Sequence, residues 1–289
     1  MSDRSVEALY EQVRAVVPVA GSDARPTVTQ VAPGIRVLAL RTPTLPPAAH
    51  TNVYLVGPQG GPVAVVDPGS PYLDQQAILD DELGRIGGVA SVLLTHHHGD
   101  HVGGATALAE RWSVPIAAHA ATARRLDGIV AVTQVLDDGD VIHGATCVFT
   151  PGHAEGHLCF ELPGAVIAGD MVAGLGTILI DPDEGDMALY LASLEKLRSR
   201  AQAAILPAHG PSIPDGHAKL TEYLSHRRMR EQRVLDALTQ GGSVEELVER
   251  VYVDTPKVLW PIAERSLLAH LVKLSREGRA REASGRWSL

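Results

Sequence analysis

Cysteine is nearly absent from this chain of 289 residues, which contains only Cys147 and Cys159. Two cysteines cannot build a disulfide framework, and their spacing is not the close pairing of a thiolate zinc site. We therefore expect both to be small buried hydrophobic side chains. Long apolar runs are also missing, because no stretch approaches the ~18 uninterrupted apolar residues that span a bilayer. The sequence thus argues against a membrane-spanning protein and against a disulfide-stabilised one.

The N-terminal segment lacks the layout of a signal peptide. Glu7 and Glu11 precede a short apolar stretch, and Pro18 interrupts that stretch. We expect residues 1–21 to form an amphipathic helix and the protein to be cytoplasmic.

Basic residues are in the minority, since 25 Lys and Arg stand against 34 Asp and Glu and give a formal net charge of −9. Phosphate binding relies on Lys and Arg that release counterions, so this balance argues against a protein that coats nucleic acid non-specifically. The charge is uneven, with a net of −12 over residues 1–216 and of +3 over residues 217–289. We expect an acidic body followed by a mildly basic tail.

Strands and helices are interspersed along residues 1–215, which we expect to form the catalytic domain. Short apolar runs bounded by turn residues predict strands, and longer amphipathic stretches predict helices. The expected strands are 28–31, 35–40, 51–56, 63–67, 90–95, 116–118, 141–150, 160–162, 165–168 and 204–206, and the expected helices are 75–85, 103–112 and 189–201. This order predicts an α/β fold in which two sheets are sandwiched between helices, an αββα arrangement.

The character of the chain changes after Pro214, and residues 216–289 are expected to form a small second domain. A long charged helix is predicted over 217–238. Ser243 and Glu246 form a capping box that opens a second helix. A third helix over 261–277 precedes a short hairpin over 279–289. Three helices and a hairpin are the elements of a winged-helix module.

The strongest chemical signal is the segment Thr95-His-His-His-Gly-Asp-His101, which contains HxHxDH directly after a predicted buried strand. Alternate residues of an extended segment face the same side, so His96 and His98 can reach one metal ion. Asp100 and His101 then turn the other way and can reach a second ion. Imidazoles and carboxylates are ligands that Zn²⁺ accepts, and two neighbouring ions form a hydrolytic site.

Two metal ions need more donors than this motif supplies. His153 in Pro-Gly-His, Asp170 in Ala-Gly-Asp and His209 in Pro-Ala-His-Gly each stand where a predicted strand ends. Each also has a neighbouring glycine that permits a tight turn. The sequence therefore predicts a site built from several strand ends.

HxHxDH followed by a lone His, an Asp and a last His resembles the signature of the metallo-β-lactamase superfamily, over residues ~30–215. The resemblance implies a first metal ion held by His96, His98 and His153. It implies a second ion held by Asp100, His101 and His209, with Asp170 bridging the two. We expect two Zn²⁺ per chain, with Mn²⁺ or Fe²⁺ as alternatives.

A narrower resemblance extends through the tail, to the group around beta-lactamase-like protein 2. It is carried by Ala168–Thr177, Leu206–Pro211, Tyr223–Gln232 and Ala269–Leu274. Members of that group act as single-strand endoribonucleases, and relatives in polyketide pathways act as thioesterases. The tail separates this chain from the true β-lactamases, which lack it, so antibiotic hydrolysis is not expected.

Asp100 is the expected catalytic residue, because it can both ligate a metal ion and accept a hydrogen bond from the attacking hydroxide. Asp67 and His157 are candidates for orienting the ligands. Alternation points His97 away from the ions. Tyr190 and Thr177 are expected to pack in the core or in a loop.

Arg227, Arg228, Arg230 and Arg233 form a basic cluster on one predicted helix. Interleaved acidic residues favour a solvated, ion-paired face over a phosphate site. We expect the tail to form a wall of the substrate groove or an element of a homodimer.

Three functions remain open. The first is a binuclear hydrolase acting on an ester, a thioester or a lactone, so that the partner is a small acyl substrate. The second is a phosphodiesterase that cleaves single-stranded RNA, which the tail favours and the acidic charge disfavours. The third is an iron-dependent oxidoreductase of the same fold, disfavoured because all seven ligands of the two-metal set are present.

Overall fold

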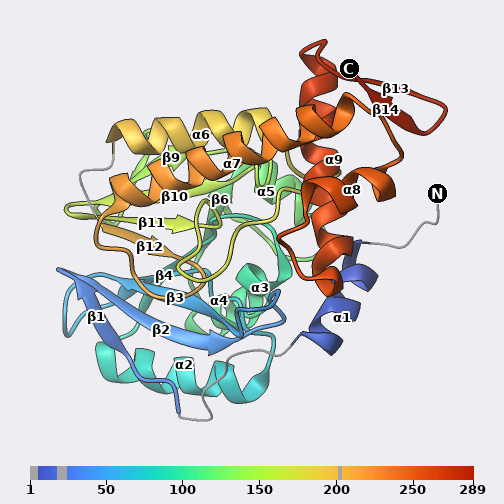
Figure 1. Cartoon of the computed structure of the whole chain (residues 1–289). Coiled ribbons are helices and arrows are strands. Elements are labelled where there is room, and N and C mark those ends of the chain that lie inside the picture. The colour runs from blue at the N-terminus through green and yellow to red at the C-terminus, as the bar shows by residue number, and fades with distance from the viewer. Residues whose placement is uncertain (1–5, 18–24, 201–203) are drawn as a thin grey trace.

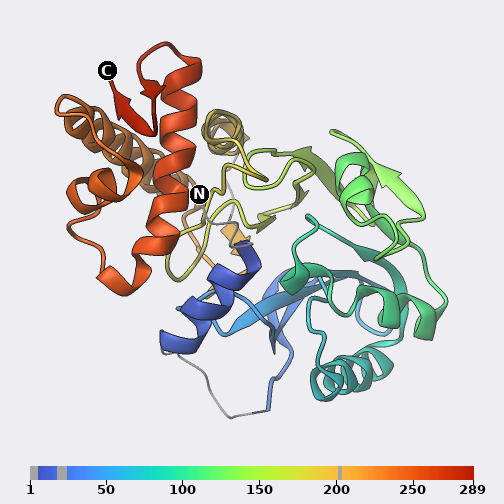
Figure 2. The same cartoon turned by 90° about the vertical axis from the view of Figure 1, so that its right-hand side faces the viewer.

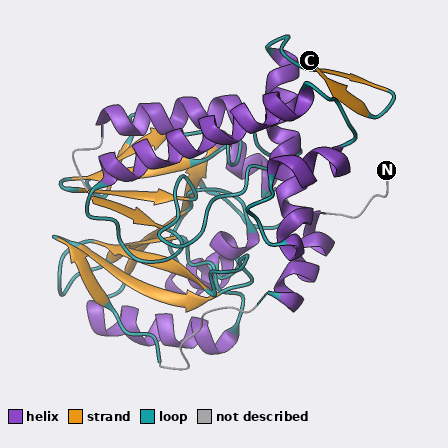
Figure 3. Cartoon of the chain, viewed as in Figure 1, coloured by secondary structure: helices purple, strands orange, loops and turns teal. Residues whose placement is uncertain are grey.

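The structure, a computed structural model, describes residues 6–17, 25–200 and 204–289. Two β-sheets lie face to face in the middle of the molecule, and helices cover the outer face of each, as Figures 1 and 3 show. This is the predicted αββα sandwich. Among the described helices, none is long and apolar enough to cross a membrane.

The first sheet has seven strands in the order β1-β2-β3-β4-β5-β6-β7. Neighbours are antiparallel from β1 to β4 and parallel from β4 to β7. The strands are β1 (Thr29–Ala32), β2 (Ile35–Arg41), β3 (His50–Val56), β4 (Val63–Val66), β5 (Val89–Leu93), β6 (Ile116–His119) and β7 (Gln134–Leu136). The register of the long β2–β3 pair aligns Ile35 with Val56 and Arg41 with His50. Every residue of β4 is buried, as expected for a strand covered on both faces.

The second sheet has five strands in the order β12-β11-β10-β9-β8, of which β11 and β12 run parallel. The strands are β8 (Val141–Ile142), β9 (Ala145–Phe149), β10 (Leu158–Leu162), β11 (Ala165–Gly169) and β12 (Ala204–Pro207). The prediction of one strand over 141–150 was wrong, because His143 and Gly144 adopt φ of 48° and 77° and turn the chain between β8 and β9. Two consecutive positive φ angles are typical of a tight hairpin turn.

Helices complete the two outer layers. The first sheet is covered by α2 (Leu73–Ile86) and α4 (Ala105–Trp112), and the second by α6 (Met187–Arg200) and α7 (Gly216–Leu238). Short helices α3 (Gly99–Val102) and α5 (Ala120–Arg125) follow β5 and β6, and α5 and β7 were not predicted. Separate apolar clusters fill the space under each helical layer and between the sheets. Cys147 and Cys159 are buried and unpaired, as predicted, and burial raises the pKa of Cys147 to about 11 and of Cys159 to about 12.

The C-terminal module stands beside the sandwich at the right of Figure 1. It contains α8 (Val244–Val251), the single turn η1 (Lys257–Leu259), α9 (Trp260–Arg276) and a hairpin of β13 (Arg281–Ala283) and β14 (Arg286–Ser288). The predicted capping box is present, because the Ser243 side chain accepts from Glu246 N and the Glu246 side chain accepts from Ser243 N. The helix α7 joins the two cores, since Leu220 packs under the second sheet and Val234 packs in the tail.

The N-terminal helix α1 (Val6–Val16) lies against the same side of the molecule as α9, which the two views in Figures 1 and 2 show. It falls within the predicted helix over 1–21, whose residues 1–5 and 18–21 lie outside the described part of the chain.

Candidate metal centre

The loops that follow β4, β5, β9, β11 and β12 carry the polar residues singled out in the sequence. Because both sheets end their parallel strands on the side that faces the C-terminal module, these loops meet there. The structure brings all seven predicted ligands into three overlapping groups of potential metal-binding side chains. The groups are His96 with His98 and His153, His96 with His101 and Asp170, and Asp100 with His101 and His209.

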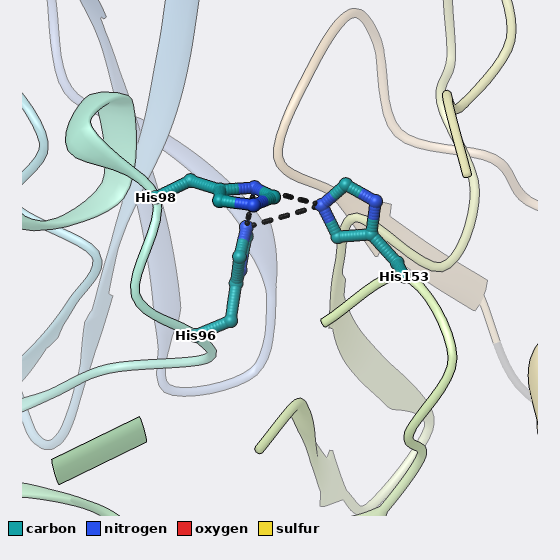
Figure 4. A group of neighbouring side chains, drawn as sticks. All are labelled: His96, His98 and His153. Carbon is teal, nitrogen blue, oxygen red and sulfur yellow. Dashed lines mark hydrogen bonds between the residues drawn. The ribbon is translucent and has the colours of Figure 1, made fainter. Parts of the chain in front are cut away.

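In the first group three ring nitrogens face one another (Figure 4). His96 Nε2 lies 2.9 Å from His98 Nδ1 and 3.3 Å from His153 Nε2. The third distance, between His153 Nε2 and His98 Nδ1, is 3.0 Å. Donors at ~2.0–2.1 Å from a tetrahedral Zn²⁺ lie about 3.3 Å apart, so the triangle is close to the size that one ion requires.

The second nitrogen of each ring determines where its proton sits. His98 Nε2 lies 2.9 Å from Glu184 Oε2, and His153 Nδ1 lies 2.9 Å from the carbonyl oxygen of Leu179. A carboxylate and a carbonyl only accept hydrogen bonds, so each ring donates its proton there. The nitrogens that face the triangle therefore carry lone pairs.

His96 follows the same rule through a hydroxyl. Thr95 Oγ1 donates to Asp67 Oδ2 at 2.6 Å, so its lone pair accepts from His96 Nδ1 at 3.0 Å. Burial holds the pKa of His96 well below its usual value and lowers that of His153 to about 4, so both rings are neutral near pH 7. Three lone pairs within 3.3 Å repel one another unless a cation lies between them.

The group of Asp100, His101 and His209 repeats the pattern. His101 Nδ1 donates to Asp67 Oδ2 at 2.8 Å, and His209 Nδ1 donates to the carbonyl oxygen of His50 at 3.0 Å. His209 Nε2 then faces Asp100 Oδ2 at 3.5 Å. His101 Nε2 is buried without a hydrogen-bond partner among the described residues. A positive charge would therefore stabilise the arrangement of these two Nε2 atoms around the Asp100 carboxylate.

Asp170 lies between the group of His96, His98 and His153 and the group of Asp100, His101 and His209. Its Oδ2 is 3.5 Å from His153 Nε2, while its Oδ1 is 3.3 Å from His209 Nε2 and 3.6 Å from His101 Nε2. The side chain thus turns one oxygen toward each group. This placement is the one expected of a bridging carboxylate.

The carboxylates around His101 and His209 favour a positive charge among them. Burial lowers the pKa of His101, but the carboxylates of Asp100, Asp170 and Asp67 outweigh it and raise that pKa to about 10. Burial also opposes the charge on Asp170, yet His209 and His101 hold its pKa well below the usual value. In the protein alone, a proton on the imidazoles supplies the positive charge that these carboxylates require. The residues therefore fit metal ions, and the clusters can bind them.

Two glycines allow close packing beside the predicted ligands Asp100 and Asp170. Gly169 has φ +47°, and a Cβ there would lie 2.6 Å from His157 Nε2, which accepts the backbone N–H of Asp170 at 3.2 Å. A Cβ on Gly69 would lie 1.7 Å from the carbonyl oxygen of Asp100. Asp67 thus bonds Thr95 and His101, and His157 bonds the backbone of Asp170, which are the contacts that orienting groups would make.

Glu184 was not identified in the sequence. Its carboxylate accepts from His98 Nε2 and lies 3.7 Å from His97 Nε2, so His97, His98 and Glu184 form a fourth group of potential metal-binding side chains, in which His98 is the one predicted ligand. Glu184 belongs to an acidic loop over 181–186 that carries no motif. The tail holds this loop, because Arg265 of α9 bonds Asp181 at 2.8 Å and also contacts Asp183, while Arg276 contacts Asp186.

A cavity of about 810 Å³ opens over the clusters. It is bounded by the segment 43–48, the segment 173–179 and the C-terminal module, so the tail forms a wall of the groove as anticipated. Thr177 lines the cavity, whereas Tyr190 is fully buried and its hydroxyl donates to the carbonyl oxygen of Met171 at 2.8 Å.

The prediction for the arginine cluster was wrong for half of it. Arg228 and Arg233 are on the expected ion-paired face, with Glu195 and Asp254 at 2.7 Å. Arg227 and Arg230 are instead 3% and 9% exposed and line the cavity. Their spacing continues the buried stripe of Leu220 and Val234 along α7, which is the signal that could have found them.

The sequence model of the metallo-beta-lactamase superfamily matches residues 46–209. The chain belongs to this superfamily. The model of the beta-lactamase associated winged helix domain matches residues 243–287, which confirms the winged-helix tail. Members of the superfamily are generally hydrolytic enzymes.

Similar proteins match most of the chain. A beta-lactamase-like protein 2 homolog of Drosophila melanogaster is 31% identical over 279 residues, covering 89% of this chain and 92% of the relative. An atrochrysone carboxyl ACP thioesterase of Passalora fulva is 30% identical, covering 78% of this chain and 70% of the relative. A beta-lactamase domain protein from Burkholderia ambifaria has the same fold, with a TM-score of 0.81, 24% identity and coverage of 92% and 95%.

Proposed function

We propose that the protein is a hydrolase with two Zn²⁺ sites that acts on an ester, a thioester or a lactone. The observation that carries the proposal is the convergence of five imidazoles and two carboxylates at one end of the sandwich, where five of these seven side chains line one cavity. The first ion would be held by His96, His98 and His153, and the second by Asp100, His101 and His209, with Asp170 shared. Two such cations supply Lewis acidity, which polarises a carbonyl oxygen and lets water ionise near neutral pH.

Asp100 is the proposed catalytic residue. Its carboxylate lies in the cavity lining, beside His209 at 3.5 Å, and its backbone is held by close packing against Gly69. Burial tends to raise the pKa of Asp100, but the neighbouring His101 and His209 imidazoles hold it below the usual value. An ionised Asp100 accepts a hydrogen bond from the attacking water and orients it toward the substrate carbon.

The residues that line the cavity support an acyl substrate over RNA. Its walls are largely apolar, and the aromatic side chain in its lining is that of Tyr252, so the described residues offer little surface for base stacking. The apolar lining residues are Pro43, Leu45, Pro46, Pro47, Ala48, Ala173, Leu175, Ile178, Leu179, Leu259, Ile262 and Ala263. The thioesterase among the relatives has a substrate of the same chemical class. The lining and this relative thus both favour an acyl substrate, and single-stranded RNA is the competing substrate that the assay includes.

One assay tests the proposal. The zinc-loaded protein is incubated in parallel with an acyl thioester, a lactone and a fluorogenic single-stranded RNA, each with and without a chelator. We expect chelator-sensitive hydrolysis of the thioester or the lactone and at most weak cleavage of RNA. Cleavage of RNA alone, with a steep loss of rate as salt rises, would replace the acyl substrate by a phosphodiester. Metal analysis that finds iron, with redox turnover and no hydrolysis, would favour the oxidoreductase.

A further inference from the structure

The wall that α7 contributes to the cavity contains a buried positive charge that the proposed hydrolysis does not use. Arg227 is 3% exposed and lines the cavity. Its Nη2 donates to the carbonyl oxygen of Ile178, and its guanidinium lies 5.2 Å from the centre of the Tyr190 ring. Within the described part of the chain, its Nε has no hydrogen-bond partner and no carboxylate lies within 4 Å of the group. An arginine keeps its charge under all ordinary conditions, so this charge is buried and uncompensated.

Arg230 lies one turn further along α7 and lines the same cavity. Its Nη1 donates to Asp254 Oδ1 at 2.7 Å and to the carbonyl oxygen of Val251 at 3.1 Å, while its Nε has no partner among the described residues. The carboxylate of Asp254 also binds Arg233 at 2.7 Å. One carboxylate is therefore shared by two guanidinium groups, and the wall retains an excess of positive charge.

Neighbouring groups on this wall do not reduce that excess. His226 lines the cavity, and burial together with Arg227 and Arg230 lowers its pKa to about 4, so the ring is neutral near pH 7. Glu231, the next acidic residue on α7, is engaged with Lys273 at 2.7 Å and with Arg279 at 3.1 Å. A buried guanidinium without a counter-ion costs stability unless a ligand supplies the anion.

We propose that Arg227 and Arg230 bind a carboxylate on the acyl part of the substrate, so that the preferred substrate is an acyl ester or thioester whose acyl chain carries a second, negatively charged group. This inference rests on the proposed hydrolase function. Both arginines and members of both metal-binding clusters line one cavity of about 810 Å³, and apolar side chains form much of the remaining wall. An apolar chain with a carboxylate matches that lining, since a guanidinium can hold a carboxylate through two parallel hydrogen bonds.

The test compares two matched thioesters, the mono-N-acetylcysteamine thioester of adipic acid and the N-acetylcysteamine thioester of hexanoic acid. They have the same chain length and differ by the terminal carboxylate. We expect wild-type kcat/KM to favour the adipyl thioester. Arg227→Met should lower kcat/KM for the adipyl thioester by about 10- to 100-fold, the range for a hydrogen bond to a charged group, and leave the hexanoyl value within about threefold.

Arg228→Met is the matched control. Arg228 lies next to Arg227 on α7, but its side chain is 67% exposed and bonds Glu195, away from the cavity lining. It should change neither substrate. Equal kcat/KM for the two thioesters in the wild type, or an equal loss for both in Arg227→Met, would overturn the inference, because a purely structural role of Arg227 affects both substrates alike.

Calorimetry of the wild-type protein with adipate and with hexanoate keeps the inference testable should Arg227→Met not fold. We expect adipate to bind at least about tenfold more tightly, because one carboxylate remains for the arginines while the other takes the place of the hydrolysed group. Equal affinity would refute the anion site even if thioesters are hydrolysed. Tighter binding of adipate without hydrolysis of any thioester would support the anion site and refute the proposed hydrolase. Turnover of RNA that falls in Arg227→Met, with no preference for adipate, would assign the arginines to a phosphate and overturn the carboxylate.

Discussion

Replacing Arg265 by methionine should weaken the first metal site from a distance. Arg265 belongs to the winged-helix tail, and its Nε donates to Asp181 Oδ2 at 2.8 Å. Asp181 is 5% exposed, so the variant leaves a buried carboxylate without its partner. Removing one member of a buried pair costs about 3 kcal/mol of unfolding free energy, which for a protein of this size lowers Tm by roughly 6–12 °C.

The same variant should loosen the loop over 181–186, whose Glu184 accepts a hydrogen bond from His98 Nε2 at 2.9 Å. Loss of such an outer partner typically reduces metal affinity 10- to 100-fold, and we expect about tenfold here because Glu184 itself remains. Chemical denaturation measures the stability, and competition with a chromophoric chelator measures the affinity for Zn²⁺. The double variant Arg265→Met with Asp181→Asn should recover most of the lost stability, because it removes the stranded charge.

Arg279→Met serves as the control, since Arg279 is also an arginine of the tail, just after α9, but its side chain is 47% exposed and pairs with Glu231 and Glu277. It should cost under about 1 kcal/mol and leave the metal affinity unchanged. If Arg265→Met behaved like this control in both measurements, the tail would have no part in organising the metal centre, and the argument from the loop over 181–186 would be wrong.

Three further variants probe other parts of the account. Asp100→Ala should reduce kcat by at least about 10²-fold, and turnover near wild type with intact metal content would remove Asp100 from its catalytic role. Gly169→Ala places a Cβ 2.6 Å from His157 Nε2 and should destabilise the protein by about 2 kcal/mol and weaken metal binding, which a thermal melt and a zinc titration check. The His270 imidazole, whose Nδ1 lies 3.8 Å from Glu231 Oε2, and the Lys273 ammonium lower the pKa of Glu231 to about 2, so its stabilisation is full above its ordinary value of 4.5 and is lost as pH falls through about 2. In Glu231→Gln the unfolding free energy should therefore fall less steeply between pH 4.5 and 2 than in the wild type, and an unchanged slope would show that the Glu231 interactions do not stabilise the fold.

Much of the fold followed from local patterns. Apolar runs placed most strands, and the capping box of Ser243 and Glu246 placed the second helix of the tail. The turn between β8 and β9 was not predicted, because nothing in the sequence marks His143 as left-handed. Such a conformation is unusual for a residue other than glycine. The helix α5 and the strand β7 are too short for their periodicity to stand out.

The residues of the candidate site likewise divide into those that the sequence could predict and those that it could not. The seven ligands were predictable because each combines a suitable side chain with a strand end, and such ends converge in this type of fold. Glu184 was not, because its role depends on how a motif-free loop folds back onto His98. The burial of Arg227 could have been inferred from its place in the apolar stripe of α7, yet composition alone favoured a solvated face. Sequence thus locates side chains on their own elements, whereas contacts between distant segments required the structure.

The most direct test of the central claim is a count and location of bound zinc. The protein is saturated with Zn²⁺, freed of excess metal, analysed for metal per chain and crystallised for anomalous diffraction at the zinc edge. We predict two ions per chain, one at His96, His98 and His153 and one at Asp100, His101 and His209, with Asp170 between them. In His153→Ala the count should fall to one. A single ion in the saturated wild type, or ions bound away from these side chains, would contradict the account.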